Sequence, residues 1–284
     1  MMYHRHVKYA VLLLLLVGCG SSDAGDPLDG GAGDGGSSDA RAGDDGALAD
    51  AALRDDDRDG LDDARELALA RDYLPFLALS PTDGCKVGGL LARVRPHPMS
   101  ARCVLITYVH LFDKDCGIGG HDGDNEAFGV TVDPALPAPQ GIRAVKAISH
   151  QGTLCERQSS CGDVGGLTAC QTLMKGAVAW PALWSSRNKH GGYVNRTSSC
   201  TTFATCIDTC EDNTTAQARE IVNVGEPAQH LVSNLSTQGF ITAANGWTSA
   251  GLMNYDPWGG QDFGGAGKVS EDLVDPAFVT PGCP

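Results

Sequence analysis

The chain has 284 residues and a formal net charge of −14 at pH 7. Most of that charge lies in residues 20–66, where fifteen acidic residues stand against four arginines. Because the sequence contains no basic stripe that could displace the counterions of a phosphate backbone, nucleic acid is not expected as a partner.

The N-terminus has the pattern of a lipoprotein signal peptide. Arg5 and Lys8 precede an apolar run at residues 10–17, and Leu-Val-Gly stands immediately before Cys19. The run is too short to remain as a membrane-spanning helix, so residues 1–18 are predicted to be cleaved. A plain secretory signal is the alternative. Gly20, rather than Asp, follows the cysteine, which resembles the usual sorting rule for outer-membrane lipoproteins. We therefore expect an exported chain held by a lipid on Cys19 in the bacterial cell envelope, at the outer membrane of a Gram-negative host.

The cysteine count agrees with export. Eleven cysteines minus Cys19 leave ten, an even number that suits five disulfides in an oxidising compartment. Their connectivity cannot be deduced from their spacing.

Residues 19–54 are predicted to form a disordered acidic tether. They are almost entirely Gly, Asp, Ala and Ser, without an aromatic residue. Such a composition cannot bury enough apolar surface to offset the entropy of ordering, and its carboxylates repel one another and keep the segment extended.

Residues 55–66 have the spacing of a calcium-binding loop. Carboxylates stand at positions 1, 3, 5, 9 and 12, and a glycine at position 6 is followed by an apolar residue. Ca²⁺ takes about six to eight hard oxygens around a sharp turn. The predicted ligands of a structural ion are Asp55, Asp57, Asp59, Asp63 and Glu66. The alternative is that an Asp-rich segment produces the pattern by composition and supplies a helix N-terminus with favourable negative charge.

Residues 67–284 are predicted to form one mainly β domain. A helix is expected at residues 61–79, where an apolar face continues until Pro75 and Pro81 end it. After Cys85, short apolar runs separated by Gly, Pro, Asn and Asp indicate strands. These runs occupy residues 104–111, 127–132, 142–148, 177–184 and 218–224. The expected fold is an antiparallel β-sandwich with an N-terminal helix and disulfide-braced loops.

The densest polar cluster lies at residues 110–126, directly before an apolar strand. Asp124 and Glu126 are two residues apart and share one face of an extended chain, while His121 can fold back from a glycine-rich turn. Two carboxylates and an imidazole suit calcium, magnesium or manganese better than zinc. The alternative is a turn whose carboxylates only accept hydrogen bonds from the backbone.

The same cluster resembles a known family. Gly120-His121-x-x-Asp124-x-Glu126 is similar to the Gly-His-Arg-His-Asp-Trp-Glu signature of the necrosis-inducing (Nep1-like) protein family, and its His-x-Gly-Asp-x-Glu form resembles the vacuolar protein sorting-associated protein 62 family. The resemblance implies a divalent metal held by four side chains, namely Asp113, His121, Asp124 and Glu126.

Three later segments extend this resemblance. Residues 147–152 and 183–193 are similar to strands of the family that end near histidines, which makes His150 and His190 candidates for the cleft; each could instead pack beside a loop. Residues 223–227 resemble a closing segment of the sorting-type relatives. The Arg, second His and Trp of the toxin signature are replaced here by Asp122, Gly123 and Asn125, so the resemblance does not extend to cytolytic activity.

Three functions remain open from the sequence. The usual hydrolase elbow, zinc-protease helix and complete phosphate loop are absent. The first hypothesis is a non-enzymatic surface lipoprotein whose metal-containing sandwich binds a polar head group or glycan. The second is a metal-dependent hydrolase of a glycan or phosphoester with His150 or His190 as general base. The third is a structural surface protein without catalytic activity.

Overall fold

The computed structural model describes residues 54–85, 88–162, 167, 170–197, 200, 206–211, 215–216, 221–225 and 257–283. The predicted signal peptide, Cys19 and the tether up to residue 53 lie outside the described residues. No helix among the described residues is long and apolar enough to cross a membrane.

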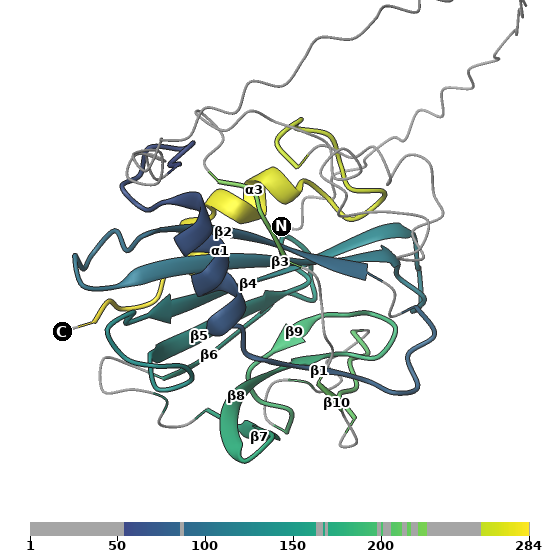
Figure 1. Ribbon diagram of the computed structural model, residues 1–284. Coiled ribbons are helices and arrows are strands. Elements are labelled where there is room, and N and C mark those ends of the chain that lie inside the picture. The colour runs from purple at the N-terminus through teal and green to yellow at the C-terminus, as the bar shows by residue number, and fades with distance from the viewer. Residues whose placement is uncertain are drawn as a thin grey trace, which may run out of the picture. The chain divides into compact units, whose positions relative to one another are not determined.

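Two sheets dominate the described chain (Figure 1). The larger sheet has the strand order β11-β2-β3-β4-β5-β6. Its strands are β2 (Gly88–Pro96), β3 (Val104–Lys114), β4 (Asp122–Val132), β5 (Ile142–Ser149), β6 (Arg157–Gly162) and β11 (Ile221–Asn223). Neighbouring strands of this sheet are antiparallel except β11 and β2, which are parallel.

The smaller sheet has the order β10-β1-β8-β7, and β9 pairs with β8. Its strands are β1 (Phe76–Leu79), β7 (Thr172–Lys175), β8 (Val178–Ser185), β9 (Gly192–Tyr193) and β10 (Thr215–Ala216). Here β1 and β8 run parallel. The main core fills the space between the sheets, where Tyr108 and Phe128 stack with ring centroids 4.8 Å apart. The mainly β sandwich predicted from the sequence is confirmed.

Helix α1 (Asp63–Asp72) is shorter than the helix predicted at residues 61–79. It begins after Asp62, whose side chain accepts a hydrogen bond from the amide of Arg65 and so caps the helix. Because Pro75 cannot continue a helix, the chain leaves α1 at Tyr73 and enters β1, all four residues of which are buried. The phenol of Tyr108 donates to the carbonyl of Ala70 over 2.8 Å and holds α1 against the sheet.

Two short helical segments cover the outer face of the larger sheet. They are α3 (Val269–Val274) and the 3₁₀ segment η2 (Pro276–Phe278). Their buried residues Val269, Leu273 and Phe278 form a second apolar cluster with Val109 and Leu111 of β3. The C-terminal segment therefore lies over the same strands that carry the polar cluster.

All ten cysteines after Cys19 are paired, which confirms the five disulfides expected from the count. The pairs are Cys85–Cys116, Cys103–Cys283, Cys155–Cys206, Cys161–Cys170 and Cys200–Cys210. Two of them flank Asp208, because Cys206 and Cys210 are bonded to Cys155 and Cys200.

Candidate metal and ligand site

The register of β3 and β4 places two predicted metal ligands side by side. Asp124 lies opposite Phe112, and Glu126 lies opposite His110. Alternate residues of a strand share a face, so both carboxylates project from the same side of the sheet. Asp124 is 6% exposed and Glu126 is 8% exposed. Both acids are therefore largely withdrawn from water.

His121 lies in the turn that precedes β4. Its Nδ1 is 2.7 Å from the carbonyl oxygen of Gly123. Because a carbonyl only accepts hydrogen bonds, Nδ1 carries the proton and Nε2 keeps its lone pair. Gly123 has φ of +74°, and a Cβ at this position would lie 2.5 Å from the carbonyl oxygen of Phe263. The backbone conformation at the start of β4 thus requires glycine.

His190 is buried between two carboxylates. Its Nδ1 is 2.7 Å from Asp124 and its Nε2 is 3.3 Å from Asp83, while its ring stacks on Phe112 with centroids 3.8 Å apart. Burial of the ring lowers its pKa, but the bonds and charges of the two carboxylates outweigh burial and raise it to about 9. His190 does not line the cavity described below. His190 therefore positions Asp124 from the side away from the cavity and does not itself contact a ligand there.

Asp208 does not line the cavity, but it bonds to His150, which does, and the sequence did not indicate it. It is 4% exposed, and its Oδ2 accepts hydrogen bonds from His150 Nε2 over 2.8 Å and from the phenol of Tyr193 over 2.9 Å. Its other oxygen, Oδ1, has no hydrogen-bond partner. The signal that could have located it is its position between Cys206 and Cys210, within the cysteine-rich region.

Glu126 lies among other acids. Burial raises its pKa well above the usual value, and the charges of Asp124, Asp208 and Asp272 raise it further. Asp272, on α3, accepts a hydrogen bond from the side-chain amide of Asn125. Burial raises the pKa of Asp272 to about 7. The site therefore concentrates negative charge in a poorly solvated position.

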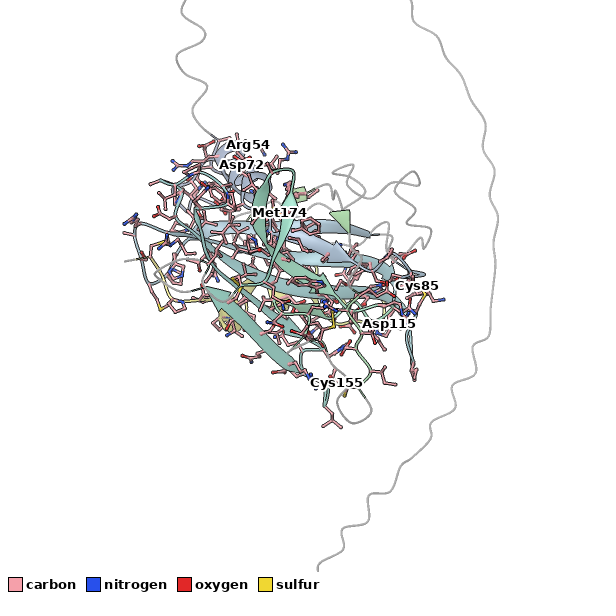
Figure 2. The ribbon with its side chains drawn as sticks, turned by 90° about the horizontal axis from the view of Figure 1, so that it is seen from below. Arg54, Asp72, Cys85, Asp115, Cys155 and Met174 are labelled. Carbon is pink, nitrogen blue, oxygen red and sulfur yellow. A yellow bond between two sulfur atoms is a disulfide. The ribbon has the colours of Figure 1, made fainter. Side chains whose placement is uncertain are left out.

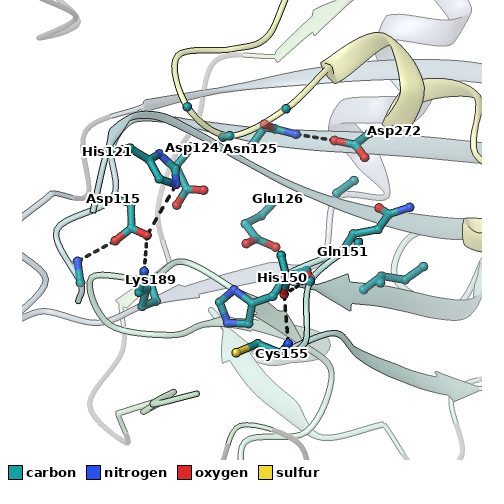
Figure 3. Close-up of a pocket in the computed structure, with 18 of the residues that line it drawn as sticks. Asp115, His121, Asp124, Asn125, Glu126, His150, Gln151, Cys155, Lys189 and Asp272 are labelled. Atoms are coloured by element: carbon teal, nitrogen blue, oxygen red, sulfur yellow. Dashed lines mark hydrogen bonds and ion pairs between the residues drawn. The ribbon is translucent and has the colours of Figure 1, made fainter. Parts of the chain in front are cut away.

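A cavity of about 1070 Å³ opens beside these residues (Figure 3). Asp124, Glu126, His121 and His150 line it, and Figure 3 shows the Glu126 carboxylate between Asp124 and His150. Further charged residues of the lining are Asp115, Glu271, Asp272 and Asp275 against Arg187, Lys189 and Lys268. The charge of the described lining is negative on balance.

Asp113 is separated from the other three predicted ligands. It lies between Phe112 and Lys114 on β3, so strand alternation directs it to the face opposite Asp124 and Glu126, and it is absent from the cavity lining. Asp115 lines the cavity instead. Its carboxylate accepts from Lys189 over 2.7 Å and lies 3.9 Å from His121 Nε2.

The donor set of the cavity fits a hard divalent cation by its chemistry. It offers two buried carboxylates and an imidazole whose second nitrogen is hydrogen-bonded to a carbonyl, the usual arrangement behind a metal-bound histidine. No three donor atoms of the cavity lining lie within 4.8 Å of one another. Among the described residues, the one group of three donors that lie this close together is Asp55, Asp57 and Asp59.

The acidic loop 55–66 brings most of its predicted ligands together. Asp55, Asp57 and Asp59 form the cluster just named, and Gly60 has φ of +96°. Glu66 is 1% exposed, and its Oε2 accepts a hydrogen bond from Asn223. Burial raises the pKa of Glu66 to about 8.

The remaining predicted ligand of the loop, Asp63, accepts a hydrogen bond from the amide of Asp56 over 3.0 Å. Arg54, beside the loop, lies at the end of the domain away from Asp115 and Cys155 of the cavity (Figure 2). The loop and the cavity are therefore separate sites.

Comparison with known proteins gives matches among solved structures. No protein-family model matches the chain, and no curated protein matches it. A structure described as a toxin fold for microbial attack and plant defense is 18% identical, with a TM-score of 0.36, and the match covers 75% of this chain and 90% of that one. NLPPya in complex with glucosamine is 18% identical, with a TM-score of 0.34, over 73% of this chain and 87% of that one. NLPPya in complex with mannosamine is 17% identical, with a TM-score of 0.33, over 73% and 88%. These three solved structures are Nep1-like proteins, the family that the motif of this chain resembles.

Proposed function

We propose that this chain is a surface lipoprotein whose acidic cavity holds a divalent cation and binds a polar head group or glycan. Asp124, Glu126 and His121 hold the ion, calcium or magnesium. A second ion, a structural calcium, occupies the acidic loop 55–66. A lipid on Cys19 attaches the exported chain to the cell envelope at the outer membrane.

The observation that carries the proposal is the environment of Glu126. A carboxylate that is 8% exposed and lies near Asp124, Asp208 and Asp272 is costly to ionise without a cation. Of its acidic neighbours, Asp124 and Asp208 already bond to His190 and His150. A divalent cation beside Glu126 would offset the remaining negative charge.

The geometry of His121 supports the same assignment. Its Nδ1 proton is taken by the carbonyl of Gly123, which fixes the tautomer and leaves Nε2 for a ligand bond. The side chain is 35% exposed and lies in a turn rich in glycine, so it has room to move toward Asp124 and Glu126. We expect the three donors to close in when the ion binds.

The form of the cavity favours a ligand with a polar head beside an apolar surface. Its volume of about 1070 Å³ is large enough for a sugar. Exposed apolar side chains lie at its edge: Ile118 is 81% exposed, Ile207 is 53% exposed, and Leu154 in the adjoining turn is 99% exposed. A bound cation with open coordination positions would accept oxygens of a polyhydroxy or anionic ligand. The apolar edge suits a glycolipid or another lipid with a polar head group.

One observation favours hydrolysis as a second candidate. His150 lines the cavity, and Asp208 orients its ring through a bond of 2.8 Å, as a general base and its orienting carboxylate are commonly arranged. His190 does not suit this role, because both of its nitrogens face carboxylates and it is buried. Hydrolysis predicts turnover of a glycan or phosphoester that is lost in His150→Gln.

Calorimetric titration of calcium and magnesium into the metal-stripped full-length chain tests the cavity site. All variants carry Glu66→Gln, which removes a ligand of the loop ion. Asp124→Asn and Glu126→Gln are then compared with Asp122→Asn, which changes an exposed residue outside the cavity. The proposal predicts one ion that only the first two substitutions remove, and tighter binding of glucosamine or glucose when that ion is present. If the cavity binds no ion, or if Asp124→Asn still binds it, the proposed cavity site would be contradicted.

A further inference from the structure

The acidic loop contains more than a pattern of aspartates. Asp57 is 2% exposed and its Oδ2 has no hydrogen-bond partner, and the Oδ2 of Asp59 is likewise buried without one. Glu66, at position 12 of the loop, is 1% exposed, and its Oε1 also has no partner. Unsatisfied buried carboxylate oxygens are costly, so three of them around one turn indicate a cation that the protein binds there.

The burial of Glu66 is the independent observation. It belongs to α1 and lies outside the group of oxygens within 4.8 Å, but it is almost completely buried, and the charges of Asp57, Asp59 and Asp63 raise its pKa. The two carboxylate oxygens of Glu66 differ. Oε2 accepts a hydrogen bond from the side-chain amide of Asn223 on β11, and Oε1 has no hydrogen-bond partner. Glu66 thus connects the acidic cluster to an edge strand of the larger sheet.

The backbone of the loop already has the curvature that an ion needs. The amides of Asp59 and Gly60 donate to the Asp55 carboxylate over 3.2 and 3.1 Å, and the amide of Leu61 donates to Asp59 over 2.8 Å. These bonds hold the three aspartates in a common turn. Arg93 of β2 interacts electrostatically with Asp57, Asp59 and Glu66, but its single charge does not balance three carboxylates.

We propose that Asp55, Asp57, Asp59 and Glu66 bind one calcium ion and that this ion clamps α1 and the acidic loop onto β11. This inference rests on the structural calcium of the proposed function, and it specifies that this ion fastens α1 and the loop to β11. Calcium is favoured over magnesium, because a long carboxylate reaching in from a helix gives the higher and less regular oxygen coordination that calcium accepts.

The clamp has a defined target in the sheet. β11 has three residues and pairs with β2 as an edge strand. The amide of Val224, directly after β11, donates to the carbonyl of Ala92 over 2.9 Å. A short edge strand opens easily, so an ion that fixes Glu66 and, through it, Asn223 should slow the opening of β11.

The experiment combines calcium titration with hydrogen exchange on the full-length chain. An Asp124→Asn background removes the cavity ion, so calcium that still binds reports the loop. Glu66→Gln keeps an oxygen that can accept from Asn223 but removes the ligand charge. Asp62→Asn is the matched control, since it removes one charge from the same loop at a non-ligand position and asparagine caps the helix equally well.

The expected result is one calcium ion in the Asp124→Asn background, weakened at least about 10-fold by Glu66→Gln and little changed by Asp62→Asn. Calcium should slow exchange of the amides of α1 and of residues 221–224, and Asn223→Ala should retain the ion while losing the effect at residues 221–224. Equal affinity in Glu66→Gln, or binding without slower exchange at β11, would overturn the clamp. Failure of the folded Asp124→Asn variant to bind calcium, and of Glu126→Gln, which leaves the His190–Asp124 pair intact, would overturn both the clamp and the loop ion. The cavity site is judged separately by the ion that Asp124→Asn removes.

Discussion

His190 shows how single residues prepare the cavity. Its ring is held between Asp124 and Asp83 and stacks on Phe112, so one oxygen of Asp124 is fixed from behind. The sequence marked His190 for the cleft by its place in a family-like segment. It could not indicate the pairing, because the partners come from three other parts of the chain. Asp208 was missed for the same reason.

Replacing His190 by glutamine should destabilise the fold strongly. The substitution leaves Asp83 and Asp124 buried without their cationic partner, which typically costs about 3–5 kcal/mol. Chemical denaturation of the metal-stripped protein at pH 7 measures the loss. His121→Gln is the control, because His121 is 35% exposed and makes one hydrogen bond, so a loss of about 1 kcal/mol or less is expected. Equal losses in the two variants would contradict the assigned role of His190.

Asp272 should make stability depend on pH. Burial raises its folded pKa to about 7, whereas an unfolded Asp titrates near 4. Ionisation therefore costs folding free energy as the pH rises from about 4 to about 7, and the full cost is present above pH 7. Asp272→Asn should stabilise the metal-stripped protein by an amount on the order of 1–3 kcal/mol at pH 8 and by much less at pH 4.5. Denaturation curves at the two pH values measure this difference, and an equal gain at both would contradict it.

Local sequence patterns predicted the positions of the strands better than they predicted which strands pair with one another. β3 and β5 begin where the apolar runs at residues 104 and 142 indicated, because β-branched and apolar side chains fill the space between the sheets. β2 was not predicted, since its arginines and glycines interrupt the alternation. The parallel pairings of β1 with β8 and of β11 with β2 join distant segments, and no local signal encodes them.

The same limit applies to the candidate site. The spacing of Asp124 and Glu126 correctly placed both on one face of β4, and the loop spacing correctly brought Asp55, Asp57 and Asp59 together. Asp113 came from the family motif alone, and strand alternation separates it from the cavity.

The Cys155–Cys206 disulfide should matter for the cavity as well as for stability. It joins the turn after His150 to the segment that carries Asp208. A Cys155→Ala/Cys206→Ala variant should lose about 2–4 kcal/mol of stability and also bind the cavity ion more weakly. The matched variant Cys161→Ala/Cys170→Ala should lose stability but keep the affinity for the ion. Thermal denaturation and calorimetry measure both effects, and equal ion affinity in the two variants would argue against this role.

At the scale of the whole molecule, charge and apolar surface are unevenly distributed. Residues 20–66 carry most of the net charge of −14, and three exposed apolar side chains, Ile118, Ile207 and Val274, line the cavity.

The lipid anchor is tested by labelling with a radioactive fatty acid. The exported chain should take up the label and remain with the membrane fraction, and Cys19→Ser should lose both properties. Labelling that persists in Cys19→Ser would contradict an anchor at this residue.

The apolar edge of the cavity should contribute to binding of lipid surfaces. In the Cys19→Ser background, Ile118→Ser combined with Leu154→Ser should weaken binding to phosphatidylcholine vesicles that contain digalactosyl diacylglycerol by about 10-fold. Met174→Ser, which changes a residue 58% exposed on β7, should leave binding unchanged. Sedimentation with the vesicles measures the difference, and an equal effect of Met174→Ser would indicate nonspecific adsorption.

Anomalous diffraction from crystals grown with manganese tests whether the acidic cavity holds a divalent cation. We expect an anomalous peak within coordination distance of Asp124, Glu126 and His121, and the loss of that peak in Asp124→Asn crystals. A peak confined to the loop at residues 55–66, with none in the cavity, would contradict this expectation.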